Sequence, residues 1–166
     1  MATHDEPART SHLSTGGPGD DELGLLRVDH VGIAVPDLDA AIEFYTATFG
    51  MTCVHTETNR EQGVREAMLR VGTDRTGAQL QLLAPASPES SIARFLDRRG
   101  PGVQQVAYTV RDVTRAAAVL RDRGLRLLYD EPRGGTAGSR INFVHPADAG
   151  GVLVELVEPA PDAHTP

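Results

Sequence analysis

The stretch Val28-Asp-His-Val-Gly-Ile-Ala-Val35 is predicted to form a strand, and a related stretch, Val103-Gln-Gln-Val-Ala-Tyr-Thr-Val110, follows it 75 residues later. A second pair of stretches repeats as well. Leu80-Gln-Leu-Leu-Ala-Pro85 corresponds to Val154-Glu-Leu-Val-Glu-Pro159 near the end of the chain. An internal duplication of this kind predicts two copies of one structural unit.

Each copy also carries signals for one helix. Asp37 and Asp112 are suited to be N-caps, and Gly50 and Gly124 are suited to end the helices that these residues begin. Each copy is therefore predicted as a strand, a helix and three further strands. The expected elements are 27–35, 38–49, 51–57, 63–71 and 78–84 in the first copy, and 102–110, 113–123, 125–129, 139–144 and 151–157 in the second.

These copies predict an α+β fold. Two tandem βαβββ modules, at about residues 26–86 and 101–159, are expected to form a curved mixed sheet around a central cleft. A helix at about 88–98 is expected to join them, because Ser87-Pro-Glu89 supplies a cap followed by proline at the first helical position.

Residues 25–159 are accordingly predicted to form a single domain. Residues 1–24 are poor in apolar side chains and rich in Ser, Thr, Gly, Pro and Asp, so we predict a disordered tail. Residues 160–166 are predicted to be a short C-terminal tail.

The composition excludes several classes of function. The chain has sixteen arginines and no lysine, which excludes a Schiff-base lysine and a P-loop lysine. Its net charge of −7 disfavours nucleic-acid and membrane-surface partners. Cys53 is the single cysteine, so an intramolecular disulfide and a multi-cysteine metal site are excluded. With no secretory signal or long apolar run in the sequence, we expect a cytoplasmic protein.

Strand alternation places four polar residues at related positions. His30 precedes Gly32 on one face of its strand, and Gln105 holds the corresponding position in the second copy. Gln81 and Glu155 correspond to each other in the closing strands. Two curved halves that meet would bring these four side chains to a common point.

A shared divalent metal would satisfy these four groups if they are buried. Imidazole nitrogen with carboxylate and amide oxygens suits Co, Ni, Zn or Mn. Spacing alone leaves other interpretations open. A lone histidine in a strand is often a hydrogen-bonded core residue, and a glutamate in a terminal strand is often solvated.

The sequence resembles the vicinal-oxygen-chelate superfamily, which includes glyoxalase and ring-cleaving dioxygenases, and within it the methylmalonyl-CoA epimerases. The resemblance runs from about residue 26 to residue 159. The matching stretches are Asp29-His-Val-Gly-Ile-Ala34, Glu61-Gln-Gly-Val-Arg-Glu-Ala67, Leu80-Gln-Leu-Leu83, Leu128-Tyr-Asp-Glu-Pro132, Ser139-Arg-Ile-Asn-Phe143, His145-Pro146 and Gly151-Val-Leu-Val-Glu-Leu156.

The resemblance implies a metal site with one changed ligand. The family's metal ligands correspond to His30, Gln81 and Glu155, whereas Gln105 stands where the family has histidine. An amide oxygen is a poorer ligand than imidazole for transition ions, so we expect metal binding to be weakened or lost. The resemblance further implies a homodimer acting on an acyl-CoA substrate.

The resemblance also implies inversion of the α-carbon of methylmalonyl-CoA, or of a related short branched malonyl thioester, through a metal-stabilised enolate. Glu66 and Glu155 are the implied pair of acid/base residues. From the residues alone, an exposed strand residue is the preferred interpretation of Glu66, and the nearby Glu61 competes for its role. Ser139 and Arg140 are candidates for substrate binding, since an arginine fork suits a carboxylate, but Arg140 also suits a surface ion pair.

Two alternatives of other kinds stay open. One is a divergent lyase, isomerase or cyclase of secondary metabolism with the same fold. The other is a non-catalytic protein that binds small molecules in the same cleft. A retained pair of glutamates favours an enzyme, because a binding protein has no need of paired bases.

Overall fold

The computed structural model describes residues 21–161 and confirms the α+β prediction. One mixed sheet of eight strands has the order β2-β3-β4-β1-β5-β8-β7-β6. The predicted tails fall mostly in 1–20 and 162–166, which lie outside the described residues. The elements are β1 (Leu25–Ala34), α1 (Leu38–Phe49), β2 (Thr52–Asn59), β3 (Val64–Arg70), β4 (Gln79–Pro85), α2 (Ser91–Arg99), β5 (Gly102–Val110), α3 (Val113–Asp122), β6 (Arg133–Gly134), β7 (Arg140–Val144) and β8 (Leu153–Glu158).

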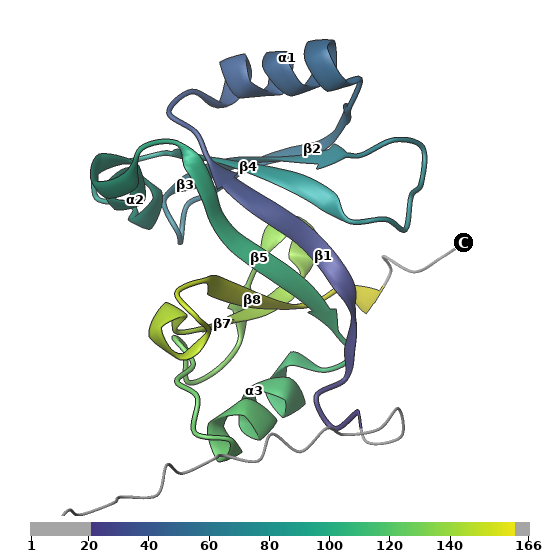
Figure 1. The fold of residues 1–166 in the computed structure, drawn as a ribbon, viewed down its shortest axis with the longest axis vertical. Coiled ribbons are helices and arrows are strands. Elements are labelled where there is room, and N and C mark those ends of the chain that lie inside the picture. The colour runs from purple at the N-terminus through teal and green to yellow at the C-terminus, as the bar shows by residue number, and fades with distance from the viewer. Residues whose placement is uncertain (1–20, 162–166) are drawn as a thin grey trace, which may run out of the picture.

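The duplication is visible in the strand pairing. β1 pairs with β4 in parallel, and β5 pairs with β8 in parallel in the second half. The two first strands, β1 and β5, pair with each other antiparallel and so join the halves. Figure 1 shows these two long strands side by side through the middle of the molecule, with α1 and α3 at opposite ends.

Each half has its own apolar core between its helix and its part of the sheet. α1 packs on a buried cluster that includes Leu69 and Leu82, and α3 packs on one that includes Val144 and Leu156. The predicted caps are confirmed, because the side chains of Asp37 and Asp112 accept hydrogen bonds from backbone N–H groups in the first turns of these helices. Because both helices pack on the outer face of the sheet, they do not cover its inner face, which can hold a functional site.

Two predicted elements differ from the structure. The linking helix is present but begins at Ser91 rather than near residue 88, because the buried Ser90 is its N-cap. The strand expected at 125–129 is reduced to an isolated bridge between Leu127 and Val144. The side chain of Asn142 bonds both the N–H and the C=O of Tyr129, which ends the pairing there, and β6 forms the edge.

No helix among residues 21–161 has the length and apolar character needed to cross a lipid bilayer. The homodimer and the cytoplasmic location stay predictions.

Candidate active site

The four polar residues of the repeat come together on the inner face of the sheet. His30 lies on β1, Gln81 on β4, Gln105 on β5 and Glu155 on β8, which are the four central strands. All four side chains are buried. The predicted convergence is therefore confirmed, and its cause is the pairing of β1 with β5 between their parallel partners.

The amide nitrogen of Gln105 lies where the other three side chains converge. Its Nε2 atom is 2.6 Å from Oε2 of Glu155 and 3.0 Å from Oε1 of Gln81. It is also 3.3 Å from Nε2 of His30. The amide therefore donates to one carboxylate and one carbonyl oxygen at the centre of the cluster.

Gly32 makes room for this arrangement. It pairs directly with Gln105 across β1 and β5. A Cβ atom at position 32 would lie 2.6 Å from Cγ of Gln105, which is closer than carbon atoms can approach. The absent side chain lets Gln105 lie flat over β1 and reach the centre of the site.

His30 is held between two carboxylates. Its Nδ1 is 2.9 Å from Oδ1 of Asp29, and its Nε2 is 3.0 Å from Oε2 of Glu155. Thr109 donates to the other oxygen of Asp29 at 2.7 Å. Burial acts to lower the pKa of His30, but its hydrogen bonds to the two carboxylates outweigh burial and raise the pKa to about 9. At neutral pH both ring nitrogens therefore carry hydrogen and donate.

Glu66 lies on β3 beside this cluster, and its carboxylate is buried. It accepts a hydrogen bond from Nε2 of Gln81 at 2.9 Å and another from the hydroxyl of Thr136 at 2.8 Å. Burial, together with the charge of its cross-strand neighbour Glu57, raises its pKa to about 7. A carboxyl group with a pKa near neutrality is suited both to take a proton and to return one.

The donor set does not fit a divalent transition ion as it is arranged here. A metal ligand must offer a lone pair, but Gln105 presents its N–H hydrogens to the centre. Within residues 21–161 no three His, Cys, Asp or Glu side chains gather in a way that could hold a metal. The expectation that Gln105 weakens or abolishes metal binding stays a prediction.

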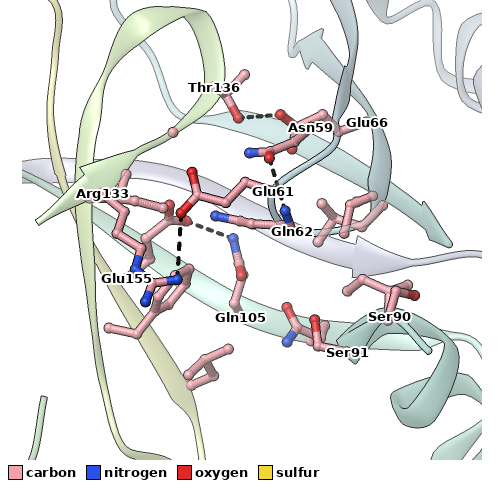
Figure 2. Close-up of a pocket in the computed structure, with 18 of the residues that line it drawn as sticks. Asn59, Glu61, Gln62, Glu66, Ser90, Ser91, Gln105, Arg133, Thr136 and Glu155 are labelled. Carbon is pink, nitrogen blue, oxygen red and sulfur yellow. Dashed lines mark hydrogen bonds and ion pairs between the residues drawn. The ribbon is translucent and has the colours of Figure 1, made fainter. Parts of the chain in front are cut away.

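Two cavities meet at the cluster. One, of about 370 Å³, has Glu66, Gln81, Gln105 and Glu155 in its wall, and Figure 2 shows several of these side chains directed into it. The other, of about 420 Å³, lies against His30. Thr136 and Glu155 belong to the walls of both. The first cavity also has apolar walls, made by Val64, Leu83, Ile92, Ile141, Phe143 and Leu153.

The structure separates the two predicted substrate-binding residues. Ser139 is buried in the wall of the second cavity. Arg140 is outside both cavities, because it begins β7 with its side chain exposed, where it pairs with Glu158 at 3.1 Å and with Thr114. The expectation that Arg140 faces the substrate is therefore corrected in favour of the alternative, a surface ion pair.

Other residues of the site were not predicted from the sequence. Thr136 bonds both Gln81 and Glu66, but it lies in an irregular loop whose path no periodicity specifies. Arg133 lies in the wall of the first cavity with its guanidinium 4.1 Å from the centre of the Tyr129 ring. Glu61, the competitor for the role of base, is exposed and pairs with Arg133 at 3.5 Å.

Comparison with known proteins agrees with this architecture. The sequence profile of the Glyoxalase/Bleomycin resistance protein/Dioxygenase superfamily matches residues 29–143. A mitochondrial methylmalonyl-CoA epimerase of Bos taurus is 34% identical over 150 residues, covering 89% of this chain and 83% of its own.

Two solved structures are closer in sequence. Methylmalonyl-CoA epimerase from Mycobacterium tuberculosis is 56% identical with a TM-score of 0.80, covering 83% of this chain and 91% of its own. A methylmalonyl-CoA epimerase in complex with methylmalonyl-CoA and NH4+ is 52% identical with a TM-score of 0.79, covering 82% and 96%. The chain therefore belongs to the glyoxalase superfamily and, within it, to the methylmalonyl-CoA epimerase family of isomerases.

Proposed function

We propose that this enzyme inverts the α-carbon of methylmalonyl-CoA, or of a related short branched malonyl thioester, by moving a proton between Glu66 and Glu155. The observation that carries the proposal is that two buried carboxylates line one cavity while standing in different environments. The substrates that the solved relatives bind support the choice of an acyl-CoA thioester.

Inversion needs one group to remove the α-proton and another to return a proton on the opposite face. Glu66 accepts hydrogen bonds from two neutral groups, those of Gln81 and Thr136, and lies beside the carboxyl group of Glu57, whereas Glu155 is bonded to the imidazolium of His30. Such different environments allow one carboxyl group to be protonated while the other is ionised. Each group then has the state that its half of the reaction requires.

The reaction also needs stabilisation of the negative charge that develops on the thioester oxygen. Donors near the two carboxylates include amide N–H groups of Gln81 and Gln105, the hydroxyl of Thr136 and Nε2 of His30. Fixed donors in a site lined by apolar walls stabilise such charge more strongly than the same groups do in water. The walls of the first cavity supply that environment.

Solvent deuterium tests the proposal. The wild-type protein, incubated with one epimer of methylmalonyl-CoA in D2O, should wash one deuterium into the α-carbon and yield both epimers, measured by mass spectrometry and chiral separation. Glu131→Gln is a matched control, because Glu131 is exposed and belongs to neither cavity. It should exchange like the wild type.

Saturable binding of the thioester without any exchange would reject the epimerase in favour of the binding protein. Exchange into a different branched malonyl thioester, with none into methylmalonyl-CoA, would correct the substrate.

A further inference from the structure

We propose, resting on the epimerase function above, that the Gln105 carboxamide takes the place of the metal ion and makes the site independent of metal. The three remaining members of the cluster, His30, Gln81 and Glu155, surround one point, and in this chain that point holds a side-chain nitrogen. That nitrogen belongs to Gln105, the residue at which this chain has glutamine where the family pattern has histidine.

The chemistry of the neighbours fixes which end of the amide points inward. With Nε2 inward, Gln105 donates one hydrogen to Glu155 at 2.6 Å and the other to Oε1 of Gln81 at 3.0 Å. With Oε1 inward, this oxygen would face two other acceptors, Oε2 of Glu155 and Oε1 of Gln81, and neither would receive a hydrogen from Gln105. A buried, unpaired acceptor of this kind costs about 1–3 kcal/mol. The inward N–H orientation is therefore the stable one.

The backbone holds the amide in this position. Gln105 is 6% exposed, and its side chain lies over Gly32, the one residue type that leaves enough room. In the other cross-strand pair of the repeat, His30 lies opposite Ala107. Gln105 therefore reaches the centre because Gly32 permits it.

The amide can serve the reaction at the moment that charge develops. When the α C–H bond breaks, the proton goes to one glutamate and its electron pair spreads onto the thioester oxygen. An N–H of Gln105 that turns from Gln81 to this oxygen stabilises the charge, and the second glutamate then returns a proton to carbon. The protons balance, and no co-reactant is needed.

Calorimetry with Co²⁺ alone tests the replacement without reference to turnover. Wild-type protein should give no saturable binding of Co²⁺ at this cluster. Gln105→His supplies an imidazole lone pair, and Gln105→Glu supplies an acceptor of the same shape. Each should bind one equivalent at least ~10-fold more tightly than any binding by the wild type. Val103→His, on the same strand but exposed and outside both cavities, controls for the added imidazole.

A second arm measures deuterium wash-in before and after treatment with a chelator. Wild-type exchange should be unchanged, whereas exchange by Gln105→His should fall and return when Co²⁺ is added. The proposal is overturned if the wild type binds one Co²⁺ as tightly as Gln105→His, or if the chelator abolishes its exchange and Co²⁺ restores it. Wild-type protein that never exchanges, with or without metal, would reject the epimerase function instead, and calorimetry would still decide the role of Gln105.

Discussion

Replacing Glu66 with glutamine should separate catalysis from stability, because the two respond in opposite directions. The variant keeps the shape of the side chain and loses its basicity. Thr136 can rotate its hydroxyl to accept a hydrogen bond, so the new amide can keep both contacts, with Gln81 and with Thr136. We expect deuterium wash-in to fall ~10²–10⁴-fold, which is the usual contribution of a positioned acid/base group.

The same change should stabilise the fold above neutral pH. The folded-state pKa of Glu66 is about 7 and lies above its ordinary value of 4.5, so the folded protein holds this proton more tightly than the unfolded chain does. The ionisation of Glu66 therefore leaves the free energy of unfolding unchanged below pH 4.5. It lowers this free energy as the pH rises from 4.5 to 7, and the free energy stays lowered above pH 7.

A rise of this size corresponds to at most about 3.5 kcal/mol at ~1.4 kcal/mol per pKa unit. Glu57 shares in the titration, so we expect about 2 kcal/mol, or roughly 6 °C in Tm for a chain of this length. Glutamine stays neutral and escapes this cost. The variant should therefore melt higher than the wild type at pH 8 and match it at pH 4.

Thermal melts at the two pH values and the wash-in assay, run on one preparation, make the measurement, with the exposed Glu131→Gln as the control in both. Two results would refute the reasoning. Near-normal exchange by Glu66→Gln would remove Glu66 from the acid/base pair. An equal Tm difference at both pH values would mean that the carboxyl group of Glu66 is not held in its neutral form by the fold.

Two further changes test the placement of neighbouring residues. Gly32→Ala should push the Gln105 side chain away and destabilise the fold by about 1–3 kcal/mol, since its Cβ would overlap a buried side chain. Melting and wash-in should both fall, and unchanged values would mean that the inner face has room to spare. Arg133→Ala should raise KM with kcat preserved, because Arg133 lies in the cavity wall, whereas Arg140→Ala should leave both constants unchanged. Equal effects of the two arginine changes in steady-state kinetics would contradict this placement.

The fold could be predicted from the sequence because the duplication supplies two sets of signals for the same arrangement of strands and helices. A strand that is ambiguous in one copy is identified by its counterpart, and Asp37 and Asp112 begin their helices as expected. The prediction failed where the copies differ. The segment 125–129 has a strand-like composition, but it keeps only an isolated bridge at Leu127, and the side chain of Asn142 takes the hydrogen bonds of Tyr129 that a sheet neighbour would make. A contact between side chain and backbone 13 residues apart leaves no periodic signal.

The candidate site was predictable to the extent that it lies on strands. Alternation identified the inner face, and the repeat related His30 to Gln105 and Gln81 to Glu155. Site residues on loops, such as Thr136, could not be predicted from strand alternation or from the repeat. Arg140 was a candidate because an arginine fork suits a carboxylate, yet its side chain lies on the outside, and the cavity wall holds Arg133 instead. Chemical suitability does not indicate the direction of a side chain at the end of an irregular segment.

The hydrogen bonds at the centre of the site follow the symmetry of the duplication and then break it. His30 of the first half bonds Glu155 of the second at 3.0 Å, and Gln105 of the second half bonds Gln81 of the first at 3.0 Å. The two links are related by the repeat, but one joins charged groups and the other joins neutral amides. Related halves suit a reaction in which protons leave and arrive on opposite faces of one carbon. Glu155 takes part in the charged link, whereas Glu66 bonds the neutral amide of Gln81. The two proton-carrying groups therefore stand in unequal surroundings, and an inversion needs that inequality, because one group must be a base while the other is an acid.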